Sequence, residues 1–174
     1  MSTYLFHTRR LRVRRFTVED SENFFLLNGD ERVMRYIRPV KSREDSDALL
    51  NENLQYYTGS AHFGAFAIEV SGENKFAGLV MLKPAYPEPI SAETGYAFIP
   101  SCWNQGYATE IVQGIIEYGS TCGISNFIAK ADPLNTASIK VLLKNGFIFR
   151  ETIQQGSQLS ALYNFQPVPL VPEH

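Results

Sequence analysis

Hydrophobic and polar residues follow different periods in different parts of the chain. RLRVRRFTV (residues 10–18) alternates the two kinds of residue, which predicts a strand. Three helix signals follow. Asp20 or Ser21 is a suitable N-cap for a helix in EDSENFFLLN, and DERVMRYI predicts a short helical turn that Pro39 stops. The segment REDSDALLNENLQYYTG is amphipathic and predicts a third helix. We therefore expect an α-rich stretch over residues 19–58.

Beyond this stretch the pattern is typical of strands, interrupted by two helices. FGAFAIEV and KFAGLVMLKP flank the turn SGEN and predict a hairpin, and AETGYAFIP predicts a third strand that Pro100 ends. Residues 107–119 carry an apolar stripe at helical spacing, formed by Ala108, Ile111, Val112, Ile115, Ile116 and Gly119. NFIAKAD, FIFRETI and ALYNFQPV predict further strands, and NTASIKVLLKNG predicts a helix that Gly146 ends. This order predicts an α/β (α+β) fold, a mixed sheet with helices on its faces.

Composition bounds the class of protein. The 174 residues are 44% hydrophobic, which suits one domain over residues 1–174. A net charge of −2 argues against a nucleic-acid partner. The arginines near the N-terminus alternate with Leu11, Val13 and Phe16, so we favour a solvent-facing strand side over a phosphate site.

The residues do not indicate a metal site, a membrane span or a signal peptide. The two cysteines form no CxxC unit and the three histidines are scattered, so we expect no metal site. No apolar run reaches the length of a membrane span, and MSTYLFHTRR lacks the order of a signal peptide. We therefore expect a cytoplasmic protein without a membrane partner.

The segment PSCWNQGYATEI (residues 100–111) joins a predicted strand to a predicted helix. The first turn of a helix has unpaired N–H groups and partial positive charge, and Gly106 would let an anion approach the backbone. A strand–turn–helix with one glycine is most often only a turn, so the segment alone favours that explanation. The chain has no GxxxxGK[ST] and no GxGxxG after a strand, which weighs against a nucleotide triphosphatase and a dinucleotide enzyme.

The next predicted helix, in DPLNTASIKVLLKNGF, places Asn135 and Ser138 on one face near its start. Taken together, these segments resemble the GCN5-related N-acetyltransferase (GNAT) superfamily, and within it the branch of ribosomal-protein N-terminal acetyltransferases. The resemblance covers nearly the whole chain, from TRRLRVRRFTVEDSENFFLL through AETGYAFIPSCWNQGYATEIV to NTASIKVLLKNGF. The family's loop pattern is Arg/Gln-Gly-x-Gly-x-Gly/Ala. Gly106 and Ala108 match it, and Asn104 replaces the first Gly.

The resemblance implies a mostly antiparallel sheet of about six to seven strands with about four helices, and acetyl-CoA as cofactor. The pantetheine arm would lie between two splayed strands, along the backbone of Phe98 and Ile99, where one N–H would polarise the thioester carbonyl. Asn135 and Ser138 would contact the cofactor from the other side. The pyrophosphate would bind the backbone of Gln105, Gly106, Tyr107, Ala108 and Thr109.

The resemblance also implies direct attack of an amine on the thioester, which calls for a base and a proton donor. Glu93 is the first candidate base, although a solvated strand glutamate would look the same in the sequence. The tyrosine that many members use as acid is Leu142 here, so Ser138 is the candidate acid. Tyr96 and Tyr107 are weaker candidates, because packing explains them.

The acceptor would lie between the α-rich stretch and the loops opposite, with YIRPVKSRED, QYYTG and AYPEPIS as walls. Arg35, Arg38, Tyr56 and Tyr57 could meet it, although surface charge explains the arginines better. We expect a peptide N-terminus or a small amine as the acceptor, and a monomer or homodimer. The alternative function is a non-catalytic acyl-CoA sensor or scaffold with the same fold.

Overall fold

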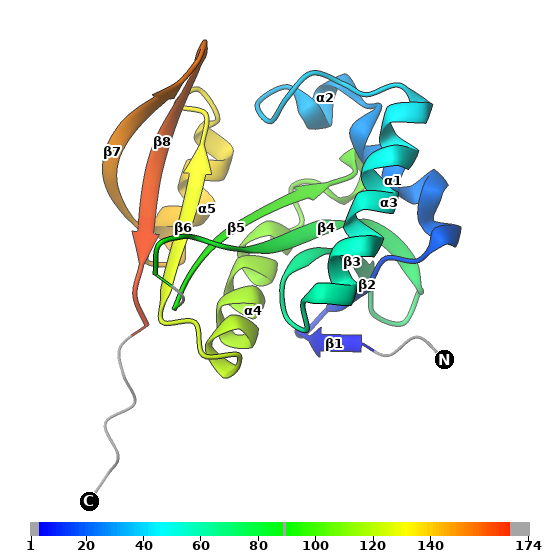
Figure 1. The fold of residues 1–174 in the computed structure, drawn as a ribbon, viewed down its shortest axis with the longest axis horizontal. Helices are drawn as coiled ribbons and strands as arrows, with labels where there is room; N and C mark the ends of the chain where they lie inside the picture. Colours follow the sequence, from blue (N-terminus) through cyan, green and yellow to red (C-terminus); the bar gives the residue numbers. More distant parts are fainter. Residues whose placement is uncertain (1–3, 89, 168–174) are drawn as a thin grey trace, which may run out of the picture.

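The computed structural model describes residues 4–88 and 90–167, which form eight strands and five α-helices (Figure 1). In chain order the elements are β1 (Tyr4–His7), β2 (Leu11–Arg15), the 3₁₀ turn η1 (Val18–Asp20), α1 (Ser21–Asn28), α2 (Glu31–Met34), α3 (Arg43–Gly59), β3 (Gly64–Val70), β4 (Lys75–Pro84), β5 (Ser91–Phe98), the 3₁₀ turn η2 (Pro100–Cys102), α4 (Tyr107–Thr121), β6 (Asn126–Ala131), α5 (Thr136–Lys144), β7 (Ile148–Gln155) and β8 (Gln158–Phe165).

The described strands form one sheet in the order β1-β2-β3-β4-β5-β6-β8-β7. Its neighbouring strands are antiparallel except β5 and β6, which run parallel. A parallel pair needs a crossover connection, and α4 supplies it. The predicted mixed, mostly antiparallel sheet is therefore confirmed.

Helices cover both faces of this sheet, and each face has its own core. The helices α1, α2 and α3 lie on one face, and α4 and α5 lie on the other (Figure 1). The first core contains Phe16, Phe24 and Leu27, which are almost fully buried. The second contains Ile111 and Ile115 of α4, packed on the strands with no exposed surface. The cores hold β5 between the two layers.

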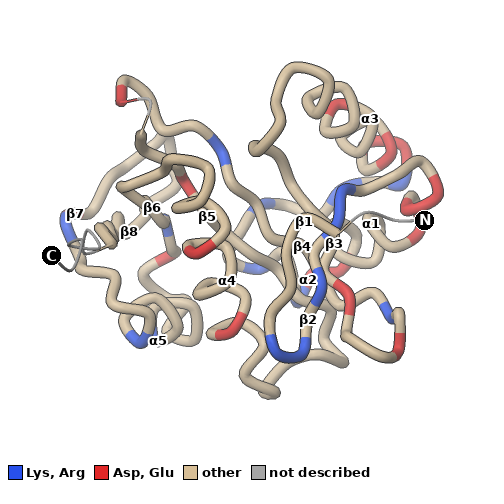
Figure 2. The backbone as a smooth tube through the Cα atoms, turned by 90° about the horizontal axis from the view of Figure 1, so that it is seen from below, with Lys and Arg blue, Asp and Glu red and all other residues tan. Residues whose placement is uncertain are grey.

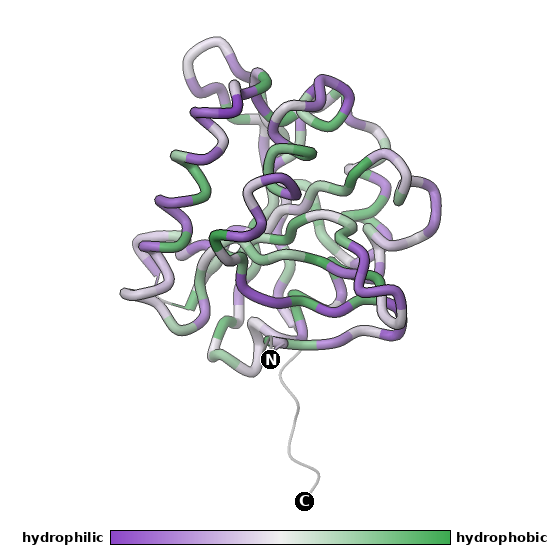
Figure 3. The backbone as a smooth tube through the Cα atoms, turned by 90° about the vertical axis from the view of Figure 1, so that its right-hand side faces the viewer, coloured by the Kyte–Doolittle hydropathy of each residue, from purple (hydrophilic) through white to green (hydrophobic). Residues whose placement is uncertain are grey.

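The surface of α3 is mainly polar. Acidic residues stand at several positions of this helix in Figure 2, and in Figure 3 it is largely hydrophilic. Ser46 and Leu50 are its buried residues, so it contacts the domain through a narrow face. In the part of the chain that the structure describes, no helix is both long and apolar enough to cross a membrane.

Most predicted elements are present with shifted ends, and one strand was not predicted. The helix predicted over residues 107–119 is α4, and the α-rich stretch contains α1, α2 and α3. The additional strand is β1, which has too few residues to show a period and gains its partners from β2. The last strand begins before ALYNFQPV and ends at Phe165, and Val168 of that prediction lies outside the described residues.

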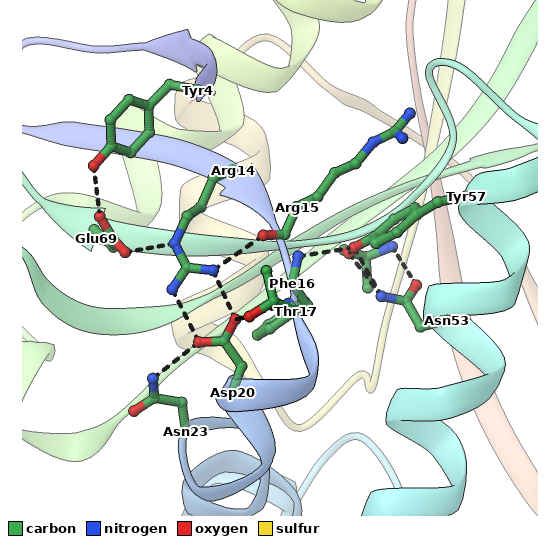
Figure 4. Close-up of polar contacts among 11 residues, drawn as sticks. Tyr4, Arg14, Arg15, Phe16, Thr17, Asp20, Asn23, Asn53, Tyr57 and Glu69 are labelled. Atoms are coloured by element: carbon green, nitrogen blue, oxygen red, sulfur yellow. Dashed lines mark hydrogen bonds and ion pairs between the residues drawn. The ribbon is translucent and has the colours of Figure 1, made fainter. Parts of the chain in front are cut away.

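The N-terminal arginines are not a simple solvent-facing row, which corrects one expectation. Arg14 donates to both carboxylate oxygens of Asp20 at 2.7 and 2.9 Å, and to Glu69 at 2.6 Å. Tyr4 donates to the other oxygen of Glu69 at 3.0 Å. Figure 4 shows this group of side chains linking β1, β2 and β3 to the start of α1. The alternation was correct, but Arg14 faces carboxylates that the local pattern does not reveal.

Candidate active site

The segment between β5 and α4 forms a tight loop at the start of α4. Two of its residues have left-handed backbone conformations: Asn104 with φ 58° and Gly106 with φ 77°. Asn adopts this conformation more readily than other residues with side chains, so Asn104 can replace a glycine there. Gly106 is the N-cap of α4 and makes no side-chain capping bond to the first turn.

The five loop residues predicted to bind phosphate gather at this helix start. The first helical hydrogen bond runs from the Glu110 N–H to the Gly106 carbonyl at 3.2 Å. The N–H groups of Tyr107, Ala108 and Thr109 therefore precede the helical ladder. Together with the helix dipole, they make a site suited to an anion.

Side chains of the loop hold its shape. The Trp103 indole donates to the Phe98 carbonyl at 2.8 Å, and the Gln105 amide donates to the Ser101 carbonyl at 2.9 Å. The Gln105 side chain is thus engaged within the loop, and its backbone remains the part available at the helix start.

The parallel strands β5 and β6 separate soon after they begin. They pair only over Ser91–Glu93 and Asn126–Ile128, after which β5 stays with β4 and β6 stays with β8. Figure 1 shows the two strands diverging. The predicted splay is confirmed, and it leaves one edge of β5 without a strand beyond Glu93.

The hydrogen bonds of Ile99 show which backbone groups face this gap. Its N–H donates to Ala77 of β4 at 2.9 Å, and its carbonyl accepts from Cys102 at 2.9 Å. Because an antiparallel ladder alternates, the N–H groups of Tyr96 and Phe98 point to the opposite edge of β5, toward the gap. Phe98 and Tyr96 are therefore better placed than Ile99 to donate to a molecule there.

Glu93 lies at the point where β5 and β6 part. Its carboxylate accepts from Lys130 of β6 at 2.8 Å, and Lys83 of β4 is its cross-strand partner. About a quarter of the Glu93 side chain is exposed, 27%. The candidate base is thus a partly exposed carboxylate paired with one lysine, and its catalytic role stays a prediction.

Ser138 of α5 and Tyr96 of β5 lie on the α4 side of the sheet. Asn135 caps α5 by accepting from the Ser138 N–H at 3.1 Å, as a capping role requires. Burial raises the pKa of Tyr96, and the nearby Ser138 side chain opposes that shift. Leu142 is buried in the core, 3% exposed, so it offers the gap no polar group.

A pocket of about 430 Å³ brings together two of the three predicted acceptor walls. It lies between the end of α3 and the β4–β5 loop, lined by Gln55, Tyr56, Thr58, Gly59, Ser60, Phe63, Pro84 and Tyr86. The segment YIRPVKSRED is not in this lining. Tyr57 points inward, where its hydroxyl bonds Asn53 and the Ala65 carbonyl, so it does not face an acceptor there.

The model of the acetyltransferase (GNAT) domain family matches residues 10–148. The chain belongs to the GNAT acetyltransferase family. It is accordingly an acyltransferase, and the resemblance in its sequence is confirmed. The uncharacterized N-acetyltransferase YnaD of Bacillus subtilis (strain 168) is 29% identical over 157 residues, 87% of this chain and 89% of YnaD.

Solved GNAT structures share the whole fold. A GNAT-family acetyltransferase from Bacillus anthracis is 28% identical with a TM-score of 0.80, covering 92% of this chain and 96% of that one. RimL, a ribosomal L7/L12 alpha-N-protein acetyltransferase in complex with coenzyme A, has a TM-score of 0.81 at 18% identity, covering 94% and 98%. At that identity the likeness concerns the fold alone.

Two interactions around the candidate site were not predicted from the sequence. Tyr96 was a weaker candidate because packing explains it, and its side chain lies near that of Ser138; the period of β5, which puts Glu93 and Tyr96 on opposite faces, was the available signal. Arg10 was assigned to a strand surface, but it donates to the Gln105 carbonyl at 2.8 Å. No local pattern relates residues so far apart.

Proposed function

We propose that this GNAT protein transfers the acetyl group of acetyl-CoA to a primary amine, on a peptide N-terminus or a small molecule. The observation that carries the proposal is the gap between β5 and β6, which borders the glycine loop at the start of α4. The RimL neighbour, in complex with coenzyme A, supports this choice of donor.

The donor would bind through backbone groups. Its pyrophosphate would accept from N–H groups of residues 105–109, where the helix start favours negative charge. The pantetheine arm would lie along the free edge of β5, accepting from Tyr96 and Phe98. One of these N–H groups would polarise the thioester carbonyl.

The two proton transfers would take place on opposite faces of β5. Glu93, on the face shared with Lys83 and Lys130, would take the proton of the attacking amine, directly or through water. Ser138, supported by the Tyr96 hydroxyl, would donate to the leaving thiolate from the α5 side. This arrangement needs no tyrosine at Leu142.

The pocket beside α3 would hold the part of the acceptor that does not react. Pro84 of its lining pairs with Ala92, the neighbour of Glu93, so the pocket lies close to the candidate base. Its described lining residues are uncharged, with aromatic rings from Tyr56, Phe63 and Tyr86. An acceptor with a neutral, ring-bearing side chain fits this lining better than a polyamine, which would call for carboxylates.

Residues 1–174 would act as one cytoplasmic acetyltransferase domain, monomeric or homodimeric. The single sheet, which spans nearly the full described length, supports one domain. Cys102 and Cys122 are free thiols, as expected in a reducing compartment.

The deciding experiment incubates the protein with acetyl-CoA and a library of peptides, aromatic amines and polyamines. Thiol release is followed, and mass spectrometry identifies the acetylated products. We expect acceptor-dependent thiol release. Binding of CoA without turnover would favour the sensor function, and absence of CoA binding would reject both functions.

A further inference from the structure

Arg10 connects the turn between β1 and β2 to the loop at the start of α4. Its Nη1 donates to the Gln105 carbonyl at 2.8 Å, and its Nε donates to Glu110 at 2.8 Å. The guanidinium also lies over the Tyr107 ring, 4.6 Å from the centroid. One side chain thus touches the loop, the first residue of α4 and the first turn of that helix.

Glu110 is held on three sides by the β1–β2 turn. Besides the Arg10 side chain, the Arg10 N–H donates to its carboxylate at 2.7 Å and the Thr8 hydroxyl donates at 2.6 Å. Burial raises the pKa of Glu110, but the bonds from Thr8 and Arg10 outweigh burial and lower it. The guanidinium therefore has an anchored anionic partner, and its position is well determined.

The bond to Gln105 determines the direction of a neighbouring N–H. In a trans peptide the carbonyl and the N–H point in opposite directions. Because Arg10 draws the Gln105 carbonyl toward itself, the Gly106 N–H must point away from Arg10. If this peptide unit flipped, a carbonyl oxygen would replace that N–H and repel a phosphate.

The Arg10 contact also offsets a charge. Glu110 places a carboxylate in the same helical turn that would receive the pyrophosphate, where like charges repel. Arg10 pairs with that carboxylate and lies beside Gly106: its Nη2 is 3.4 Å from where a Cβ on Gly106 would sit. The helix start thereby keeps its preference for an anion.

We infer that Arg10 is a positioning residue for donor binding: it holds the Gln105–Gly106 peptide with its N–H toward the pyrophosphate and neutralises Glu110. The inference rests on the proposed function, in which this loop binds acetyl-CoA. Arg10 acts through the loop, and no contact with the substrate is needed.

The test compares Arg10→Ala with Arg9→Ala, which removes the same charge from an exposed neighbour. Loss of a charge-assisted hydrogen bond should raise the Kd for CoA and the KM for acetyl-CoA about tenfold or more, with kcat changed far less. Arg9→Ala should change both by less than about twofold, because exposed charges are screened. Lysine cannot bond Gln105 and Glu110 with the same fork of donors, so the Kd and KM of Arg10→Lys should lie between those of Arg10→Ala and Arg9→Ala.

A second measurement does not depend on CoA. In NMR spectra of the free protein, Arg10→Ala and Arg10→Lys should shift the Gly106 amide resonance, and Arg9→Ala should leave it in place. Equal Kd values for Arg10→Ala and wild type, or equal rises for Arg10→Ala and Arg9→Ala, would overturn the inference. An unmoved Gly106 resonance in a folded Arg10→Lys would overturn it too. If wild type binds no CoA, the proposed function fails, while the Gly106 shift still tests the role of Arg10.

Discussion

At Gly106, the backbone conformation and the predicted phosphate site coincide in one residue. Valine at φ 77° is strained, so in Gly106→Val the loop should relax away from its present shape. Restoring that shape on binding costs about 1–2 kcal/mol, which predicts an affinity for CoA about tenfold weaker. Isothermal titration with CoA measures the change.

Gly123→Val is the matched control for this substitution. Gly123 follows the other end of α4 with φ 89°, and an added Cβ there would meet nothing within 4 Å. Both variants should lose stability to thermal unfolding, but only Gly106→Val should bind CoA more weakly. Unchanged affinity in Gly106→Val would contradict the placement of the phosphate.

Glu93 carries the prediction about the base. Glu93→Gln should lower kcat/KM about a hundredfold, because general bases contribute at least that factor. The loss should grow as the pH falls, since more of the acceptor amine is then protonated. A pH–rate profile against Glu151→Gln, an exposed glutamate of β7, measures this. A Glu93→Gln enzyme as active as wild type would remove Glu93 from the mechanism.

The elements of the site were largely predictable from the sequence, because each depends on a local pattern. The apolar stripe gave α4, and a glycine before it gave the helix start. The directions in which side chains point were harder to predict from the sequence. Tyr57 looked like a binding-site aromatic, but its hydroxyl turns inward and donates to the Ala65 carbonyl of β3, which depends on how α3 sits against β3. Contacts between elements are set by packing, which a local pattern does not encode.

The start of α5 allows capping and cofactor contact to be separated. Asn135→Ala removes the bond to the Ser138 N–H and should cost about 1 kcal/mol of stability. Ser42→Ala removes the equivalent cap of α3, where Ser42 accepts from the Asp45 N–H at 3.1 Å, and should cost a similar amount. Urea unfolding measures the stability of both variants and of wild type, and titration with CoA measures their affinities. If both variants bind CoA as wild type does, Asn135 is a cap and nothing more.

At the scale of the whole molecule, the N-terminal hairpin formed by β1 and β2 makes contacts near helices on both faces of the sheet. Through Arg14 it bonds Asp20 before α1, and through Arg10 it reaches the loop before α4. The sequence showed only a row of arginines, because their partners lie at separations that a period cannot report. The same row therefore links the sheet to α1 and, in our inference, positions the loop before α4.

The Arg14–Asp20 pair makes stability depend on pH in a definite direction. Burial alone would raise the pKa of Asp20, but the bonds from Arg14 and Thr17 outweigh it and lower the pKa. A carboxylate with a lowered folded pKa stabilises the protein above its unfolded pKa, and that contribution disappears as the pH falls through the folded value. Stability should therefore decline below about pH 4.

Asp20→Asn should remove that dependence together with the ion pair. The Asp20 side chain is 4% exposed, so leaving Arg14 with one fewer anionic partner should cost about 3 kcal/mol at pH 7. Asp30→Asn is the control: its pair with Arg32 is exposed, asparagine can still cap α2, and the cost should stay below about 1 kcal/mol. Urea unfolding from pH 7 to pH 3 measures both. Equal costs, or an unchanged pH slope in Asp20→Asn, would show that the buried pair does not set the stability of the N-terminal hairpin.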